Sequence, residues 1–309
     1  KVVCLPSKTM LYSAKTYDSA KHASKYAINV SEVSFDLSKI IVRKSKVVRK
    51  LVLGVKAKLA SNNVAIVSGE AQIIDKNTVR CGEETYEGEN LILCTGSETF
   101  IPPIPGVETV NYWTHRDALD NKELPASLAI VGGGVIGMEF ASFFNSLGVQ
   151  VTVVEMLDEI LGGMDKELSA LLRAEYAKRG IKFLLSTKVV GLSQTEGAAV
   201  VSYENAEGSG SVVPEKLLMS VGRRPVTKGF GLENLNLEKT ERGAVKVDEK
   251  MQTSVPGVYV CGDLTGFSLL AHTAVREAEV AVHSILGKED TMSYRAIPGV
   301  VYTNPEIAG

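Results

Sequence analysis

Three glycines form the strongest chemical signal in the sequence. Gly132, Gly134 and Gly137 match the pattern Gly-x-Gly-x-x-Gly, after an apolar run at 128–131 and before an apolar helical pattern that reaches Leu147. In this pattern the first glycine allows a tight turn, the second lets the backbone approach a pyrophosphate, and the third lets a helix pack on a strand. The amino end of the helix then offers N–H groups to the phosphates. The segment therefore predicts a dinucleotide site, with a purely structural glycine turn as the alternative.

The acidic residue that follows indicates which dinucleotide binds. A second apolar run at 149–155 ends in Glu155, whose carboxylate can accept hydrogen bonds from a ribose 2′-hydroxyl. Residues 156–160 read Met-Leu-Asp-Glu-Ile and include no basic side chain. A 2′-phosphate would need an Arg or Lys there. The sequence therefore favours NAD over NADP.

Two weaker signals lie toward the ends of the chain. Cys4 begins the segment Cys-Leu-Pro-Ser-Lys, and residues 258–263 read Val-Tyr-Val-Cys-Gly-Asp. An acidic side chain beside a glycine at the carboxyl end of a strand can bind a hydroxyl group of a nucleotide or flavin chain. Taken alone, Cys4 is more typical of a structural cysteine, and Gly262–Asp263 also fits a β-turn.

Seven segments together make the chain resemble a known family. In order along the chain, these are 4–8 (Cys-Leu-Pro-Ser-Lys), 93–97 (Leu-Cys-Thr-Gly-Ser), 132–139, 222–225 (Gly-Arg-Arg-Pro), 259–263, 269–272 (Leu-Leu-Ala-His) and 302–306 (Tyr-Thr-Asn-Pro-Glu). Over essentially its whole length the chain resembles the flavin-dependent pyridine-nucleotide disulfide oxidoreductases. Within this family it is most similar to the members that oxidise dihydrolipoamide with NAD, because of residues 270–272, residues 302–306 and Glu155.

The resemblance implies two cofactors, FAD and NAD, and a role for each matched position. Cys4 matches the redox cysteine nearest the flavin, Lys8 matches the lysine beside the flavin, and Glu139 matches the carboxylate that pairs with this lysine. For His272, a packing role at the start of a helix is an equal alternative to flavin contact. The implied FAD contacts are Ala71, Thr95, Gly96, Ser97, Asp263, Leu269, Leu270, Ala271 and His272. The implied NAD contacts are Gly132, Gly134, Val135, Ile136, Gly137, Glu155, Val189 and Gly222.

The implied reaction moves two electrons from the dihydrolipoyl group of a 2-oxo acid dehydrogenase complex, through a cysteine pair and FAD, to NAD. The implied protein is a homodimer. A mercuric or glutathione-type reductase and a soluble transhydrogenase are alternatives within the family. A non-catalytic NAD-binding module is an alternative of another class.

Parts of the family pattern are not in the 309 residues. They are the first Gly-rich fingerprint for FAD, the partner cysteine that precedes Cys4, and the C-terminal interface domain with its catalytic His-Glu pair. Before the second cysteine the family has Asn-x-Gly, whereas residues 1–3 are Lys-Val-Val. We therefore expect a piece of a longer protein that by itself does not oxidise dihydrolipoamide but still binds NAD.

Composition argues against several other classes of protein. Lys and Arg number 34 and Asp and Glu number 36, a near balance that gives no support to nucleic-acid binding. No apolar run approaches the roughly 18 residues of a membrane span. The cysteines Cys4, Cys81, Cys94 and Cys261 have neither Cys-x-x-Cys nor zinc-ligand spacing. No metal site is predicted, and the cysteine usage favours a reducing, cytoplasmic compartment.

Hydrophobic periodicity predicts the elements that must position these residues. Basic residues along 37–60 are interpreted as a solvated helix face, with an interaction patch as the alternative. Helices are expected after Pro6 and at 37–60, 115–120, 135–147, 165–179 and 271–286. Strands are expected at 64–67, 71–74, 78–81, 91–94, 128–131, 149–155, 181–185, 187–193, 198–204, 211–213, 216–221 and 258–261.

The fold class predicted from this order is α/β, with two Rossmann-like dinucleotide-binding domains and the NAD domain inserted in the FAD domain. The expected boundaries are 1–121 for the incomplete first part of the FAD domain, 122–240 for the NAD domain, 241–298 for the second part of the FAD domain, and 299–309 for the start of an interface domain.

Overall fold

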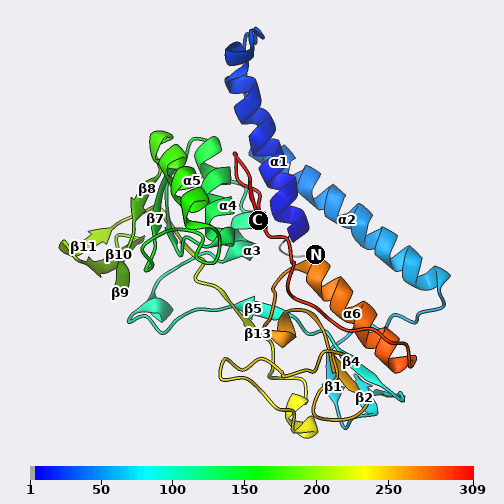
Figure 1. The fold of residues 1–309 in the computed structure, drawn as a ribbon. Helices are drawn as coiled ribbons and strands as arrows, with labels where there is room; N and C mark the ends of the chain where they lie inside the picture. The colour runs from blue at the N-terminus through cyan, green and yellow to red at the C-terminus, as the bar shows by residue number, and fades with distance from the viewer. Residues whose placement is uncertain (1–3) are drawn as a thin grey trace. The chain divides into compact units, whose positions relative to one another are not determined.

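The computed structural model describes residues 4–309, whose elements are drawn in Figure 1. These residues form two compact units. The first unit comprises the described residues up to Asn62 together with Ile101–Gly222 and Pro298–Gly309, and the second comprises Asn63–Phe100 and Arg223–Ile297. The predicted α/β class is confirmed, and the domain boundaries at 121/122, 240/241 and 298/299 stay predictions.

The first unit contains both long helices of the amino-terminal part and the glycine motif. Its helices are α1 (Cys4–Lys21), η1 (Ala23–Tyr26), α2 (Leu37–Ser61), η2 (Val107–Thr109), α3 (His115–Asp120), α4 (Val135–Ser146) and α5 (Lys166–Lys178). Its strands are β6 (Ser127–Val131), β7 (Gln150–Val154), β8 (Lys182–Leu184), β9 (Lys188–Thr195), β10 (Ala198–Asn205), β11 (Gly208–Val212), β12 (Lys216–Met219), β15 (Val300–Val301) and β16 (Ile307–Ala308).

A four-stranded parallel sheet in the order β12-β6-β7-β8 is the centre of this unit. Val131 at the end of β6 lies opposite Met219 of β12 and Val154 of β7, so three strands end at the same edge. Strand β6 is apolar throughout its inner residues because a central parallel strand is covered on both faces. This arrangement brings the loops that follow β6, β7 and β12 together at one edge of the sheet.

An apolar core joins the long helices of this unit to its sheet, and a second apolar cluster joins the sheet to β9 and β10. Met10 of α1, Phe143 and Phe144 of α4, Tyr176 of α5 and Val301 of β15 are all buried in the same cluster. Because α1 and α4 share this core, side chains on their facing surfaces are held at fixed separation.

The basic run on α2 contains one residue that is not solvated. Lys44 is 4% exposed, and its Nζ donates to the carbonyl of Leu119 at 2.7 Å and pairs with the Asp120 carboxylate. This ion pair holds the middle of α2 against the end of α3. The interpretation of the run as a solvated face is therefore wrong for Lys44.

The second unit carries the remaining predicted cofactor segments. Its strands are β1 (Ala71–Ile73), β2 (Thr78–Cys81), β3 (Glu84–Glu87), β4 (Leu91–Leu93), β5 (Ser97–Thr99), β13 (Arg223–Pro225) and β14 (Val258–Val260), and its helices are η3 (Leu232–Leu235), η4 (Gly262–Thr265) and α6 (Ala271–Ile285). Strand β14 pairs with β4 in parallel, and β13 pairs with β5 in antiparallel. Strands β1, β2 and β3 form a separate antiparallel sheet.

Two sequence predictions near the start of this unit were inaccurate. Residues 64–67 form no strand within the described chain, and their side chains are exposed. Their β-branched side chains favoured a strand, but no neighbouring strand of the described residues pairs with them. Strand β3, whose residues are all exposed, was missed because it has no apolar alternation. It forms through the turn at Gly82, which has φ +64° and lets Glu84 pair with Cys81.

Among the helices of residues 4–309, none combines the length and the apolar character that a membrane crossing requires.

Two helical glycines of the first unit should respond oppositely to substitution by alanine. A Cβ at Gly137 of α4 would lie 2.1 Å from the carbonyl oxygen of Gly132, whereas a Cβ at Gly54 of α2 meets none of the described atoms within 4 Å outside its own helix. We expect Gly137→Ala to lower stability by ~1–3 kcal/mol through overpacking and Gly54→Ala to raise it by ~0.5–1 kcal/mol. Thermal unfolding of both variants measures this. A Gly137→Ala protein as stable as the parent would contradict the packing described.

Candidate functional site

The glycine motif forms a tight turn between β6 and α4. Gly132 has φ +105°, and its absent Cβ would lie 2.2 Å from the carbonyl oxygen of Ser220, so no larger residue fits there. Gly134 is the N-cap of α4, and its Cβ position is clear of the described atoms within 4 Å. Gly137 packs its backbone on Gly132 and Ile130. The three glycines therefore act as predicted: one turns the chain, one leaves room for close approach, and one lets α4 pack on β6.

Glu155 lies at the end of β7 and closes this loop from the neighbouring strand. Its Oε2 accepts from the backbone N–H of Gly133 at 2.6 Å, and its Oε1 accepts from the backbone N–H of Leu157 at 2.8 Å. The carboxylate is thereby held at the edge of the sheet. Its remaining lone pairs can accept hydrogen bonds from the two hydroxyl groups of a ribose. The first two basic residues that follow Glu155, both on α5, are engaged by other acids: Lys166 pairs with Asp158 at 3.0 Å, and Arg173 pairs with Glu159.

Gly222 follows a strand that ends at this edge, whereas Val189 lies in the separate sheet β11-β10-β9. Gly222 follows Ser220, whose N–H donates to the Val131 carbonyl at 2.8 Å as β12 ends beside β6. Val189 is the second residue of β9 and lies two residues after Thr187, whose N–H donates to the Glu155 carbonyl at 2.9 Å. The structure thus brings the predicted contacts of the glycine motif, Glu155 and Gly222 to one edge of the sheet, with Val189 in the neighbouring strand β9.

This edge fits a dinucleotide. The first turn of α4, Val135 to Gly137, presents N–H groups that lack partners within the helix by geometry, and these attract a pyrophosphate. The open position at Gly134 lets that pyrophosphate approach the backbone. The anchored Glu155 accepts from ribose hydroxyls.

A second cluster in the first unit joins α1 to α4 through an ion pair. The Nζ of Lys8 lies 2.6 Å and 2.7 Å from the two carboxylate oxygens of Glu139. The Lys8 side chain is 34% exposed, whereas that of Glu139 is 6% exposed. The predicted Lys8–Glu139 pair is confirmed as a contact.

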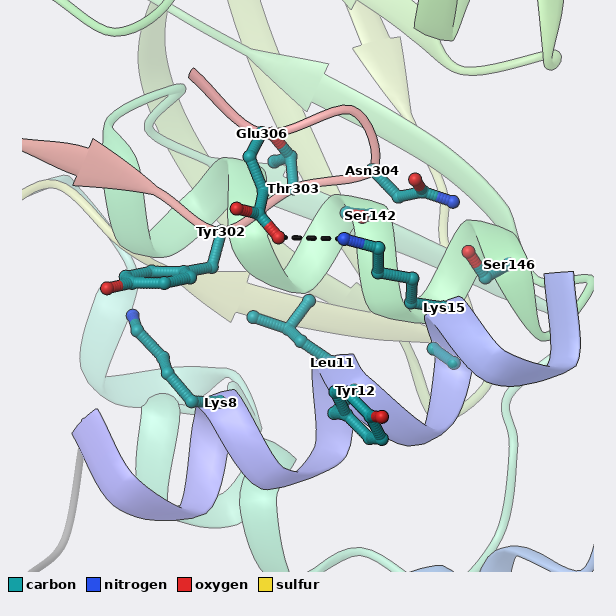
Figure 2. A pocket seen from close by; sticks show the side chains of 11 residues that line it. Lys8, Leu11, Tyr12, Lys15, Ser142, Ser146, Tyr302, Thr303, Asn304 and Glu306 are labelled. Atoms are coloured by element: carbon teal, nitrogen blue, oxygen red, sulfur yellow. Dashed lines mark hydrogen bonds and ion pairs between the residues drawn. The ribbon is translucent and has the colours of Figure 1, made fainter. Parts of the chain in front are cut away.

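Tyr302 completes this cluster. Its backbone N–H donates to Glu139 at 3.2 Å, and the Lys8 Nζ lies 4.7 Å from the centre of its ring, toward which Lys8 points in Figure 2. The segment after Tyr302 is anchored because the backbone N–H of Asn304 donates to the Tyr176 hydroxyl at 3.0 Å. The Glu139 carboxylate is therefore held by one ammonium and one backbone donor.

A small pocket opens beside this cluster (Figure 2). It has a volume of about 60 Å³ and is lined by α1, α4 and residues 302–306. An ion pair between Lys15 and Glu306, 2.8 Å long and half exposed, spans it. The pocket is too small to hold a dinucleotide.

Cys4 is the first residue of α1 and is exposed as a free thiol. It lies four residues before Lys8, so the two side chains share one face of the helix. The departure from the family pattern at Lys1–Val3 lies outside the described residues.

The predicted FAD residues of the second unit meet where β4 and β14 end. Thr95, Gly96 and Ser97 follow β4, and Asp263 follows β14 in η4. The Ser97 hydroxyl donates to the Asp263 carboxylate, and the Thr95 hydroxyl donates to the Val226 carbonyl at 3.0 Å. Carboxyl ends of parallel strands are where such sheets bind nucleotides, so this site fits the hydroxyl-rich chain of a flavin dinucleotide.

The other predicted FAD contacts lie near this site or in a different sheet. Leu269 and Leu270 lead into α6, whose first turn holds Ala271 and His272, and Ala274 of α6 lies against Gly262. His272 is exposed, so its alternative role as a packing residue is wrong. Ala71 begins β1 in the separate antiparallel sheet.

Sequence reasoning missed two side chains that organise these sites. Arg223 donates from Nε to the Ser97 hydroxyl at 2.7 Å and so orients the Ser97–Asp263 pair. Tyr302 was seen only as part of a motif, without its contacts to Lys8 and Glu139. In both cases the motif Gly-Arg-Arg-Pro or Tyr-Thr-Asn-Pro-Glu was the available signal.

Comparison with known proteins identifies the family to which this geometry belongs. A family model described as pyridine nucleotide-disulphide oxidoreductase matches residues 1–278. The dihydrolipoyl dehydrogenase of Geobacillus stearothermophilus is 35% identical over 312 residues, covering 99% of this chain and 66% of the relative. That of Thermus scotoductus is 37% identical over 312 residues, covering 100% of this chain and 67% of the relative. The chain thus spans about two thirds of the length of these curated relatives.

A solved structure gives the same result for the fold. The HOCl-induced flavoprotein disulfide reductase RclA from Escherichia coli, in its Cu(II) complex, matches with a TM-score of 0.86 at 27% identity, over 99% of this chain and 67% of that one. Proteins of the matched family use FAD and NAD as cofactors. The fold, the glycine motif, the Lys8–Glu139 pair and these matches agree, and the chain belongs to the pyridine nucleotide-disulphide oxidoreductase family.

Proposed function

We propose that this chain belongs to a flavoprotein that oxidises dihydrolipoyl groups with NAD. The observation that carries the proposal is the ion pair that joins the helix starting at Cys4 to the helix starting at the glycine motif. It links the helix that carries the Cys4 thiol to the helix that follows the glycine motif, within one compact unit. The similarity to dihydrolipoyl dehydrogenases over 99% of the chain supports the choice of substrate.

The residues of the chain would hold the cofactors and place the reacting groups. Bound FAD supplies two-electron transfer between thiols and NAD. The amino end of α4 holds the pyrophosphate of NAD, and Glu155 accepts from its ribose. Ser97 and Asp263 bind hydroxyl groups of the flavin chain, with Arg223 holding Ser97 in place.

Cys4 and Lys8 act on the thiol side of the reaction. Cys4 is one member of the redox pair, whose other member belongs to the preceding part of the family pattern. Lys8 keeps a positive charge one helical turn from Cys4, and Glu139 restricts the position of that charge. A fixed ammonium favours negative charge that develops close to it.

The same proposal extends to partner and location. The substrate is the lipoyl group of a 2-oxo acid dehydrogenase complex, the working form is a homodimer, and the compartment is the cytoplasm. Other disulfide reductases of the family are the competing assignment, and Glu155 argues against those that use NADPH.

A steady-state assay of the native gene product tests the function. We expect a yellow protein that forms NADH from dihydrolipoamide and NAD⁺ faster than it oxidises NADPH with glutathione disulfide or Hg²⁺. The opposite preference would contradict the proposed substrate. A colourless protein that binds NADH without turnover would indicate a non-catalytic module.

The selectivity for NADH over NADPH should depend on Glu155. A fixed carboxylate repels a 2′-phosphate, so NADH should bind at least tenfold more tightly, a difference of about 1.4 kcal/mol. Glu155→Gln should reduce this ratio severalfold, while Glu167→Gln, an exposed acid in the first turn of α5, should leave it unchanged. Fluorescence titration with each nucleotide gives both ratios. Equal affinities in the unmodified protein would refute the assignment to NAD.

The two lysine ion pairs of α1 should differ in their contribution to stability. Lys8→Met leaves the buried Glu139 carboxylate without its ammonium, and we expect a loss of ~1–3 kcal/mol. Lys15→Met breaks the half-exposed pair with Glu306, and we expect a loss of at most ~1 kcal/mol. Chemical denaturation of both variants under one buffer measures the contrast. Equal losses would mean that the Lys8 pair is no more than a surface contact.

A further inference from the structure

Two cysteines that the proposed reaction does not use lie side by side in the second unit. Strands β4 and β14 pair in parallel with Leu93 opposite Val260, so the next residues, Cys94 and Cys261, are neighbours in register. The ladder continues to this position, because the Cys261 N–H donates to the Leu93 carbonyl at 3.1 Å and Cys261 has extended backbone angles. Both thiols therefore project to the same face of the sheet.

The separation of these residues suits a disulfide. Neighbouring strands lie roughly 4.8 Å apart, which is inside the range of Cα separations that disulfides span. Because the pairing of β4 and β14 already fixes the separation of Cys94 and Cys261, no loop has to rearrange to bring the two sulfur atoms together.

The two thiols differ in exposure and in acidity. Cys94 is exposed, whereas Cys261 is 2% exposed. A hydrogen bond from the Cys261 thiol lowers the pKa of Cys94 to about 7, against the opposing effects of burial and of the Glu277 charge. The same hydrogen bond, together with burial, raises the pKa of Cys261. One thiol is thus an accessible nucleophile near neutral pH, and the other is a protected thiol beside it.

The charge of Glu277 acts on both thiols, and Tyr294 and Asp263 act on Glu277. Glu277 of α6 is fully buried and accepts from the Gly262 N–H at 2.5 Å, one residue after Cys261. Tyr294 donates its hydroxyl to Glu277 at 2.7 Å, and Asp263 raises the pKa of Glu277, after burial as the first cause. Because these groups are acidic, the low pKa of Cys94 depends on Cys261 as its donor.

We propose that Cys94 and Cys261 form a second dithiol centre, separate from Cys4, that exchanges with low-molecular-weight disulfides. The Cys94 thiolate attacks one sulfur of the small disulfide, whose S–S bond breaks and releases one thiolate. The Cys261 thiol loses its proton, and its sulfur attacks Cys94, which forms the Cys94–Cys261 bond and expels the second thiolate. The two released thiolates take up the two protons of the cysteines, so two protein thiols are oxidised and one small disulfide is reduced.

Peptide mapping of the full chain after incubation with oxidised glutathione tests the pathway. In the unmodified chain we expect a cross-link between the peptides of Cys94 and Cys261. In Cys261→Ser the reaction should stop halfway, with glutathione retained on Cys94. Cys94→Ser should leave Cys261 unmodified, and Cys81→Ser should behave as the parent. Glutathione that stays on Cys94 in the unmodified chain, or an absence of oxidation at both positions, would overturn the proposal.

The pH dependence of the first step gives an independent readout. The thiolate of Cys94 forms as the pH rises through its pKa, so the rate of its modification should reach half of its maximum near pH 7. Cys261→Ala removes the hydrogen-bond donor, and the midpoint should move up toward ~8.5, the value of an ordinary thiol. A midpoint that is the same in both proteins would show that Cys261 does not activate Cys94 and would overturn the proposal.

Discussion

The contact between Lys8 and Glu139 is the constraint on which the first unit depends. It joins α1 to α4 at a point where one partner is nearly buried, in an interface that is otherwise largely apolar and holds a further buried polar contact, from the Ser146 hydroxyl to the Asp18 carboxylate. A charge at this depth is tolerated only when it is paired and hydrogen-bonded. If the two helices slid past each other, the buried Glu139 carboxylate would lose its partner and the folded state would be destabilised. Cys4, at the start of α1, therefore keeps a defined place relative to the amino end of α4.

Close backbone contacts fix the geometry of the sheet edge where β6, β7 and β12 end. Gly132 and Gly137 let α4 approach the sheet so closely that only hydrogen atoms fit between them. Glu155 then uses its carboxylate to hold the loop through the Gly133 N–H. A side chain that would meet the ribose is thereby oriented before any ligand arrives, which reduces the ordering cost of binding.

Much of this site could be predicted from the sequence because its signals are local. The order β6, α4 and β7 follows from glycine spacing and apolar runs, and Cys4, Lys8 and Glu139 lie in segments whose types and order are distinctive. The Lys8–Glu139 contact was predicted only through the resemblance, since no local pattern links residues so far apart.

Features that depend on tertiary pairing could not be predicted. Lys44 has the same chemistry as its exposed neighbours, and only the position of α3 makes it buried. Residues 64–67 have β-branched side chains but no partner strand in the described chain. The neighbouring positions of Cys94 and Cys261 require the parallel register of β4 and β14, which no sequence spacing reveals. Arg223 likewise reaches Ser97 only because β13 pairs with β5.

In the proposed reaction, a thiol pair and NAD exchange electrons through a flavin held by this chain. An anaerobic titration of the native gene product tests it most directly, with the visible absorbance of the flavin as the readout. We expect dihydrolipoamide to bleach the flavin and NAD⁺, but not an equal concentration of NADP⁺, to restore its absorbance. A flavin that dihydrolipoamide leaves oxidised, or that both nucleotides reoxidise equally, would contradict the proposed electron transfer from thiols to NAD.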